Sequence, residues 1–70
     1  MREYVANRVH ELRSESEMTQ EALAEKVGVS RQTVIAIERG NYAPSVLLAM
    51  KIARAFRLPV ESVFSLRHAK

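Results

Sequence analysis

Seventy residues with a formal net charge of +3 and no cysteine indicate one small domain without disulfide bonds or thiolate metal sites. This length leaves no room for a second catalytic or ligand-binding domain, and no apolar run approaches the roughly 20 residues of a membrane span. We therefore expect a single cytoplasmic domain over residues 1–70 that needs no cofactor, metal or membrane. The basic excess favours an anionic partner.

The first predicted helix runs from about Glu3 to Glu15. Val5, Val9 and Leu12 recur at the spacing that places apolar side chains on one face of a helix. Strand-like alternation is absent from the whole chain, so the sequence predicts helices only. The two histidines, His10 and His68, stand near opposite ends of the sequence and are expected to be solvated surface residues.

The next two predicted helices are separated by only three residues, "GVS". Thr19 can cap the helix that begins at "QEALAEKV", and Gly28 is suited to the left-handed position that ends it. Ser30 can cap the following helix, which ends at Gly40. A link this short makes the two helices cross steeply, as in a helix-turn-helix unit.

The third predicted helix of the chain, which ends at Gly40, carries side chains that the domain's core does not need. Val34 and Ile37 lie three residues apart and form one buried stripe. Arg31, Gln32, Ile35 and Ala36 fall on the other faces of the same helix. A short helix with these side chains turned outward is expected to contact something other than its own domain.

The fourth helix follows the loop "NYAPS", where Ser45 is the expected cap. Its predicted apolar face consists of Val46, Ala49, Ile52, Ala53 and Phe56. A last short helical turn, "VESVF", is expected after Pro59. The chain is thus predicted to be all-α, a compact bundle of about five short helices.

The stretch "MTQEALAEKVGVSRQTVIAIERGNYAPS" resembles the helix-turn-helix of the phage repressor and Cro-like family, often called Xre-type regulators. The resemblance extends from about Asn7 to Phe64, and the chain is similar in particular to family members that consist of this domain alone. It implies a lambda-repressor-like fold with a helix-turn-helix over about residues 20–39. The matching positions are Thr19-Gln20, Leu23-Ala24, Gly28, Ser30, Ile37-Glu38 and Gly40.

The resemblance implies that the third helix enters the major groove of double-stranded DNA and reads base edges there. The base-reading residues would be Arg31, Gln32, Ile35 and Ala36. The residues expected to contact phosphates are Thr19, Gln20, Ser30, Arg39, Asn41, Tyr42 and Ser45. Plainer alternatives are solvation for Arg31, Gln32 and Arg39, partial burial for Ile35 and loop packing for Tyr42.

The same resemblance implies a buried ion pair between Arg13 and Glu38 that joins the first helix to the third. Such a pair would be architectural and not a general acid–base couple, and no other nucleophile–base set is present, so we expect no enzymatic activity. Two positions depart from the family pattern. Glu17 and Arg57 stand where turns commonly have glycine, so strained or altered turns are expected there.

Two functions follow from these features. The main hypothesis is a sequence-specific transcriptional regulator, by default a repressor, that binds an inverted repeat as a homodimer and takes no small-molecule ligand. The alternative is a protein-interaction module, antitoxin-like or bridging, with secondary DNA binding. Both would use apolar side chains that one small core cannot bury, and the expected dimer contact over residues 58–67 consists of Leu58, Val60, Val63, Phe64 and Leu66.

Overall fold

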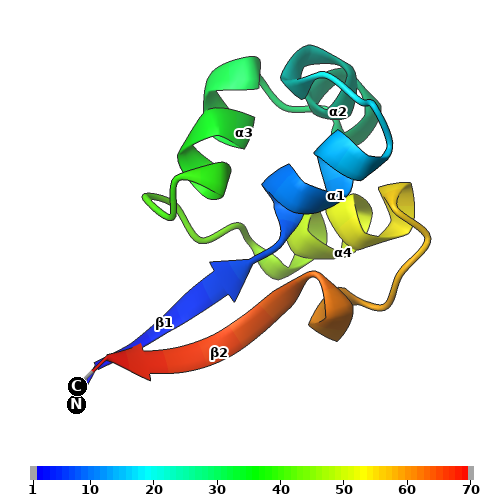
Figure 1. Cartoon of the computed structure of the whole chain (residues 1–70). Coiled ribbons are helices and arrows are strands. Elements are labelled where there is room, and N and C mark those ends of the chain that lie inside the picture. The colour runs from blue at the N-terminus through cyan, green and yellow to red at the C-terminus, as the bar shows by residue number, and fades with distance from the viewer. Residues whose placement is uncertain (1, 70) are drawn as a thin grey trace.

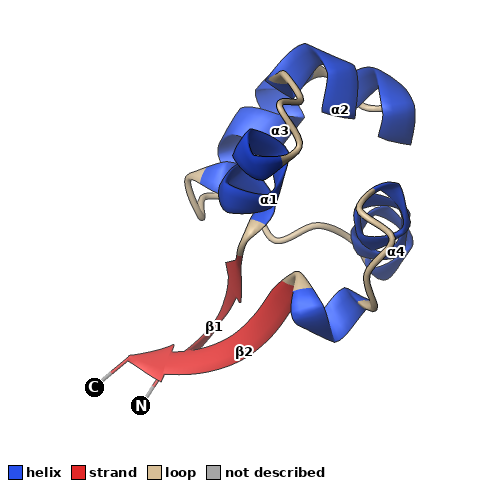
Figure 2. Cartoon of the chain, turned by 45° about the vertical axis from the view of Figure 1, so that its right-hand side comes forward, coloured by secondary structure: helices blue, strands red, loops and turns tan. Residues whose placement is uncertain are grey.

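The computed structural model describes residues 2–69 as a head of helices with a ribbon of two antiparallel strands (Figure 1). Figure 2 shows the same ribbon projecting from the head, and the pair Arg2–Ala69 lies at its tip. No helix in the described part is long and apolar enough to cross a membrane. The elements are β1 (Arg2–Asn7), α1 (Val9–Glu15), α2 (Gln20–Val27), α3 (Arg31–Glu38), α4 (Val46–Ala55), a 3-10 helix (Val60–Ser62) and β2 (Phe64–Ala69).

The starts of three helices follow directly from capping side chains. The hydroxyl oxygens of Thr19, Ser30 and Ser45 each accept a hydrogen bond from the backbone N–H three residues further on, at 3.0, 3.2 and 3.1 Å. Gly28 and Gly40 end the second and third helices with φ of +77° and +79°, a region that only glycine adopts without steric cost. The predicted helix-turn-helix is therefore present.

The prediction of a purely helical, five-helix chain is wrong at both ends. Residues 2–7 form a strand, and α1 begins only at Val9. Asn7 is the switch point, because its side-chain oxygen accepts the Val9 N–H at 3.1 Å and its amide donates to the Ile37 carbonyl at 2.9 Å. At the other end, only Val60–Ser62 forms a helical turn before the chain enters β2.

The ribbon pairs the first described residues with the last. Its register joins Val5 to Leu66 and Asn7 to Phe64, so these four side chains share one face. Phe64 is buried against the head, whereas Val5 and Leu66 lie further out and are exposed. The ribbon is therefore anchored at its base by Asn7 and Phe64, and its outer part carries apolar side chains in solvent.

The hydrophobic core lies between the helices and the base of the ribbon. The predicted apolar face of α4 is partly wrong, because Val46 is 76% exposed while Leu48 is buried. The first buried residue of α4 is thus two positions later than predicted, and Val46 faces solvent. The buried residues are Val9, Leu12, Leu23, Ala24, Val27, Val34, Ile37, Leu48, Ile52, Ala53, Val63 and Phe64.

Glu17 and Arg57 adopt left-handed backbone angles, with φ of +54° and +57°. These are the two positions where glycine was expected from the family pattern. A residue with a Cβ pays roughly 1–2 kcal/mol in this region because the Cβ lies too close to the following carbonyl oxygen. Each turn is therefore held in a strained conformation by the helices on either side.

We expect glycine at either position to stabilise the fold. Glu17→Gly and Arg57→Gly should each raise the free energy of unfolding by about 0.5–1 kcal/mol, since relief of strain exceeds the added freedom of the unfolded chain. Urea unfolding of the two variants measures this gain. Ser14→Gly, inside α1, is the matched control and should lose about 0.5–1 kcal/mol. Equal losses at all three positions would show that the two turns are unstrained.

Candidate nucleic-acid interface

Helix α3 presents one face to the core and the other to solvent. Val34 and Ile37 are almost fully buried, while Arg31 and Gln32 are exposed and Ile35 is half-buried. Ala36 is also half-buried, so the four proposed base-reading residues all lie off the core face. Figure 1 shows α3 at the edge of the head, where its outer face is not covered by another helix.

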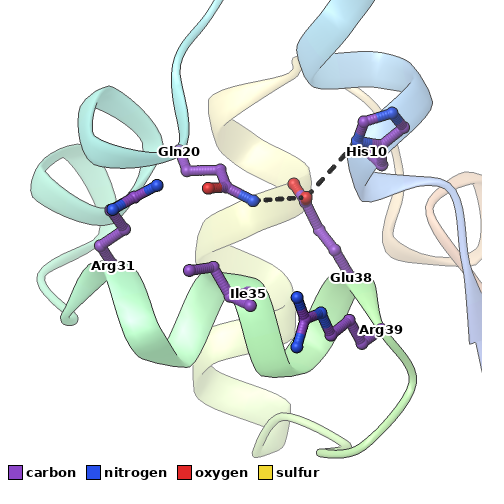
Figure 3. Close-up of a pocket in the computed structure, with 6 residues that line it drawn as sticks. All are labelled: His10, Gln20, Arg31, Ile35, Glu38 and Arg39. Atoms are coloured by element: carbon purple, nitrogen blue, oxygen red, sulfur yellow. Dashed lines mark hydrogen bonds and ion pairs between the residues drawn. The ribbon is translucent and has the colours of Figure 1, made fainter.

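A hollow of about 360 Å³ runs along α3 between the first two helices. Arg31, Ile35 and Arg39 line it from α3 and the residue just beyond, each one helical turn from the next. Figure 3 shows these three side chains along the hollow, with Gln20 above them and His10 at the far end. The structure thus brings Gln20 from α2 together with three of the predicted contact residues from α3.

The N-terminus of α2 meets the start of α3 at a second, adjoining hollow. Thr19, Gln20 and Arg31 line it together with Arg13 and Glu21. The Gln20 amide nitrogen donates to Glu38 Oε1 at 3.1 Å, and its amide oxygen is turned towards Arg31 (Figure 3). The second N–H of the Gln20 amide, the Thr19 hydroxyl and the Arg31 guanidinium can each donate a hydrogen bond at this edge.

Arg13 and Glu38 form a two-point ion pair between α1 and α3. Arg13 Nε lies 2.7 Å from Glu38 Oε2, and Arg13 Nη2 lies 3.2 Å from Glu38 Oε1. The side chains are only 13% and 6% exposed, and Arg13 Nη1 also donates to the Met18 carbonyl at 2.9 Å. A fork of this kind fixes the orientation of α3 relative to α1.

The protonation of this pair is set by two opposing effects. Burial alone would raise the pKa of Glu38, but hydrogen bonds from Arg13 and Gln20 and the positive charge of Arg13 together bring that pKa below its ordinary value. The hydrogen bond to Glu38 raises the pKa of Arg13 further. Both groups are therefore charged at neutral pH, and Glu38 is an acceptor that holds Gln20 in place.

Four predicted phosphate contacts, Ser30, Asn41, Tyr42 and Ser45, line neither of these two hollows. Tyr42 and Ser45 line a different hollow at the start of α4, and Asn41 is exposed in the loop before it. Ser45 and Ser30 both use their hydroxyl oxygens as helix caps. Lys51 lines the hollow with Tyr42 and was missed in the sequence, where it resembled any other exposed lysine of an amphipathic helix.

Two residues expected at a dimer contact belong to the core instead. Val63 and Phe64 are only 2% and 9% exposed, because the chain turns inward after the 3-10 helix and packs both side chains against the head. Leu66 is 68% exposed on the ribbon. Leu58 and Val60 are half-buried and line an apolar groove with Met50. Of the five residues predicted, only three can therefore reach a second molecule.

His10 occupies a place that the sequence did not single out. Its ring lies beside the ion pair, with Nδ1 3.0 Å from Arg13 Nη2 and 3.5 Å from Glu38 Oε1. The available signal was its position one helical turn before Arg13, on the side of α1 that faces α3.

A family model described as "Helix-turn-helix" matches residues 9–63, from the first residue of α1 to the residue that follows the 3-10 helix. The chain is 57% identical over 58 residues to the uncharacterized HTH-type transcriptional regulator YgzD of Bacillus subtilis, covering 83% of this chain and 88% of that protein. It is 28% identical over 60 residues to the cryptic phage CTXphi transcriptional repressor RstR of Vibrio cholerae, covering 86% of this chain and 54% of that protein.

Solved structures have the same arrangement of helices. The restriction-modification controller protein C.AhdI from Aeromonas hydrophila superposes with a TM-score of 0.73 at 33% identity, covering 77% of this chain and 82% of that chain. A DNA-binding protein from Bacteroides fragilis, so named only provisionally, has the same fold with a TM-score of 0.79 at 23% identity, covering 87% of this chain and 98% of that chain. C.AhdI is thus similar to this chain in sequence as well as in fold, whereas the Bacteroides fragilis protein shows the fold alone.

Proposed function

Because this chain belongs to the helix-turn-helix family of DNA-binding transcriptional regulators, we propose that it represses transcription by binding an inverted-repeat operator as a homodimer. The name of one relative, a phage transcriptional repressor, supports repression over activation. In this proposal α3 enters the major groove and the N-terminus of α2 lies against the adjacent phosphates.

The observation that carries the proposal is the outer face of α3. Arg31 and Gln32 are exposed at its N-terminal turn, where a base-reading helix makes its contacts. A guanidinium can donate two hydrogen bonds to guanine, and an amide can pair with adenine in the same way. Ile35 and Ala36 follow one turn later and suit contact with a thymine methyl group. A structural helix of a small domain has no need of this set.

A two-fold dimer would place its two copies of α3 about 34 Å apart, so half-sites should lie about 10 base pairs apart. Leu58, Val60 and Leu66 are the proposed contacts, extended by Met50, which is exposed next to the groove that Leu58 and Val60 line. Met50, Leu58 and Val60 line one groove, and apolar side chains gathered at a surface in this way are typical of a contact with another protein.

Selection of bound duplexes from a random DNA pool by the purified protein tests this function. Enrichment of an inverted repeat with half-sites about one helical turn apart supports a dimeric, specific regulator. Lack of enrichment, at salt low enough for general DNA binding, would contradict it.

Arg39 is proposed to bind a phosphate, since it continues the line of Arg31 and Ile35 beyond the end of α3. Arg39→Ala should weaken binding to every duplex by a similar factor and reduce the slope of log K against log salt by about one unit. Binding measured at several salt concentrations gives the slope. Lys26→Ala, an exposed cation in the last turn of α2, is the control and should leave the slope unchanged. An unchanged slope for Arg39→Ala would contradict the proposal that Arg39 binds a phosphate.

The exposed apolar side chains of α4 favour a second candidate function. Val46, Leu47 and Met50 are 76%, 66% and 57% exposed, and they suit a protein partner as well as a second copy. In that case the chain is an interaction module with secondary DNA binding. Sedimentation of the purified protein separates the two, because a stable dimer favours the regulator and a monomer favours the module.

A further inference from the structure

His10 is the one side chain of α1 that lines the hollow along α3. The side chain is 71% exposed, although one edge of its ring contacts the buried ion pair. It therefore lies in the same hollow as Arg31, Ile35 and Arg39, which the proposed function places against DNA.

The contacts of the ring determine where its proton lies. Arg13 has only donors, so at 3.0 Å its Nη2 must donate to the Nδ1 of a neutral His10. The proton of the neutral ring is then on Nε2, on the side away from Glu38 (Figure 3). This leaves the Nε2–H on the edge of the ring that does not contact the ion pair, and because the side chain is 71% exposed it can donate to a phosphate oxygen.

The charges around the ring favour an anion in the hollow. On its own helix the ring contacts Arg13, and from α3 it faces Glu38 and Arg39, while Arg31 lines the far end of the hollow. The facing residue of α2, Gln20, is uncharged. A second proton on the ring would occupy Nδ1 in place of the bond from Arg13 and would face Glu38 Oε1 at 3.5 Å, but Glu38 is already paired with Arg13, and the other charged side chains here, Arg31 and Arg39, are positive. A phosphate placed there would balance the added charge.

We propose that His10 is a further DNA-contacting residue, which binds a backbone phosphate from α1 and takes up a proton as it does so. The inference rests on the proposed function, since it assumes that the hollow along α3 lies against DNA. It makes binding tighter as the pH falls, because histidine is the side chain that ordinarily gains its charge between pH 8 and 5.

Measurements of binding to the selected duplex between pH 8 and pH 6 test this role. Wild-type protein should bind several-fold more tightly at pH 6, with a ceiling of about tenfold per pH unit for one proton. His10→Gln should lose that increase, and His10→Lys should bind tightly at both pH values. At pH 6 the salt slope of His10→Gln should be about one unit shallower than that of wild type. His68→Gln is the matched control, because its ring lies on the ribbon opposite Glu3.

Calorimetry adds a readout that a structural role would not change. The heat of binding in buffers of different ionisation enthalpy gives the number of protons taken up, expected to be a clear fraction of one for wild type and His68→Gln and close to zero for His10→Gln. If His10→Gln keeps the pH dependence and the proton uptake of wild type, the inference is overturned while the proposed function stands. If no duplex is bound at any pH, the proposed function and this inference both fail.

Discussion

Replacing Arg13 by methionine is expected to lower the free energy of unfolding by about 3–5 kcal/mol, the largest effect of any single change considered for this chain. The loss is large because Glu38, only 6% exposed, would keep its charge without the two hydrogen bonds from Arg13. For a domain of this size, such a loss approaches the whole stability that one small core supplies. Urea unfolding of Arg13→Met against wild type measures it.

A double variant and a matched pair serve as controls. Arg13→Met combined with Glu38→Leu removes both charges and should recover much of the loss, because a buried pair often contributes little net stability. Arg8→Met breaks the exposed pair between Arg8 and Glu11, with its 3.0 Å contact, and should cost at most about 1 kcal/mol. A loss for Arg13→Met no larger than for Arg8→Met would contradict the buried character of the pair.

The lowered pKa of Glu38 gives the same pair a defined pH dependence. A carboxyl whose pKa is lower in the folded state stabilises the fold at any pH above its pKa in the unfolded chain. That contribution decreases as the pH falls below about 4.5, the ordinary pKa of a glutamate carboxyl, and is lost once the pH has passed the folded-state pKa. Glu38→Gln should remove this part of the acid sensitivity.

Arg31→Ala is expected to weaken binding to the selected operator by about 1–3 kcal/mol, or roughly five- to 150-fold. The physical reason is the loss of two parallel hydrogen bonds to one guanine, which no smaller side chain replaces. Preference at that single base pair should disappear while preferences elsewhere in the half-site persist. Binding to the operator and to its single-base variants measures both effects.

How the loss of affinity of Arg31→Ala varies among DNA duplexes distinguishes base reading from a contact by charge alone. An equal loss on every duplex, specific or not, would make Arg31 another phosphate contact. Lys26→Ala again supplies the comparison, because it removes one exposed positive charge at the far end of α2. Arg31→Lys is the sharper test, since it keeps the charge and loses the planar fork, and it should behave like Arg31→Ala on the operator.

The helix-turn-helix could be predicted from the sequence because its signals are local. A capping hydroxyl acts on an N–H three residues away, and a left-handed glycine acts on its own turn, so Thr19, Gly28 and Ser30 define two helices with no reference to the rest of the chain. The strain at Glu17 and Arg57 was predicted from the family pattern, which commonly has glycine at these two positions. Fold class was predicted less well because it also depends on distant pairing.

The ribbon could not be predicted because its two strands stabilise each other across the whole chain. Val5, Val9 and Leu12 have helical spacing, yet Val5 pairs with Leu66 and belongs to a strand. A period of three or four residues in so short a segment does not exclude a strand when the partner is some 60 residues away. The inward turn of Val63 and Phe64, which removed them from the expected dimer contact, follows from the same pairing.

Several candidate site residues were found in the sequence through the family pattern, which specifies positions on α3 and at the start of α2. His10 was not, since a lone histidine carries no pattern of its own. Its place beside Arg13 and Glu38 depends on how α1 packs against α3, and that packing is a tertiary contact. Lys51 was not singled out either, because its place beside Tyr42 depends on how α4 packs near the turn between α2 and α3.

The register of the ribbon, which joins Arg2 to Ala69 at its tip, also determines how the protein responds to tension. When the two ends are pulled apart, the load acts on one cross-strand pair at a time, beginning at the tip, so the strands unzip and do not shear. Each step breaks at most two hydrogen bonds. The ribbon should therefore open at low force down to Asn7 and Phe64, and the helical head bears the load only after that.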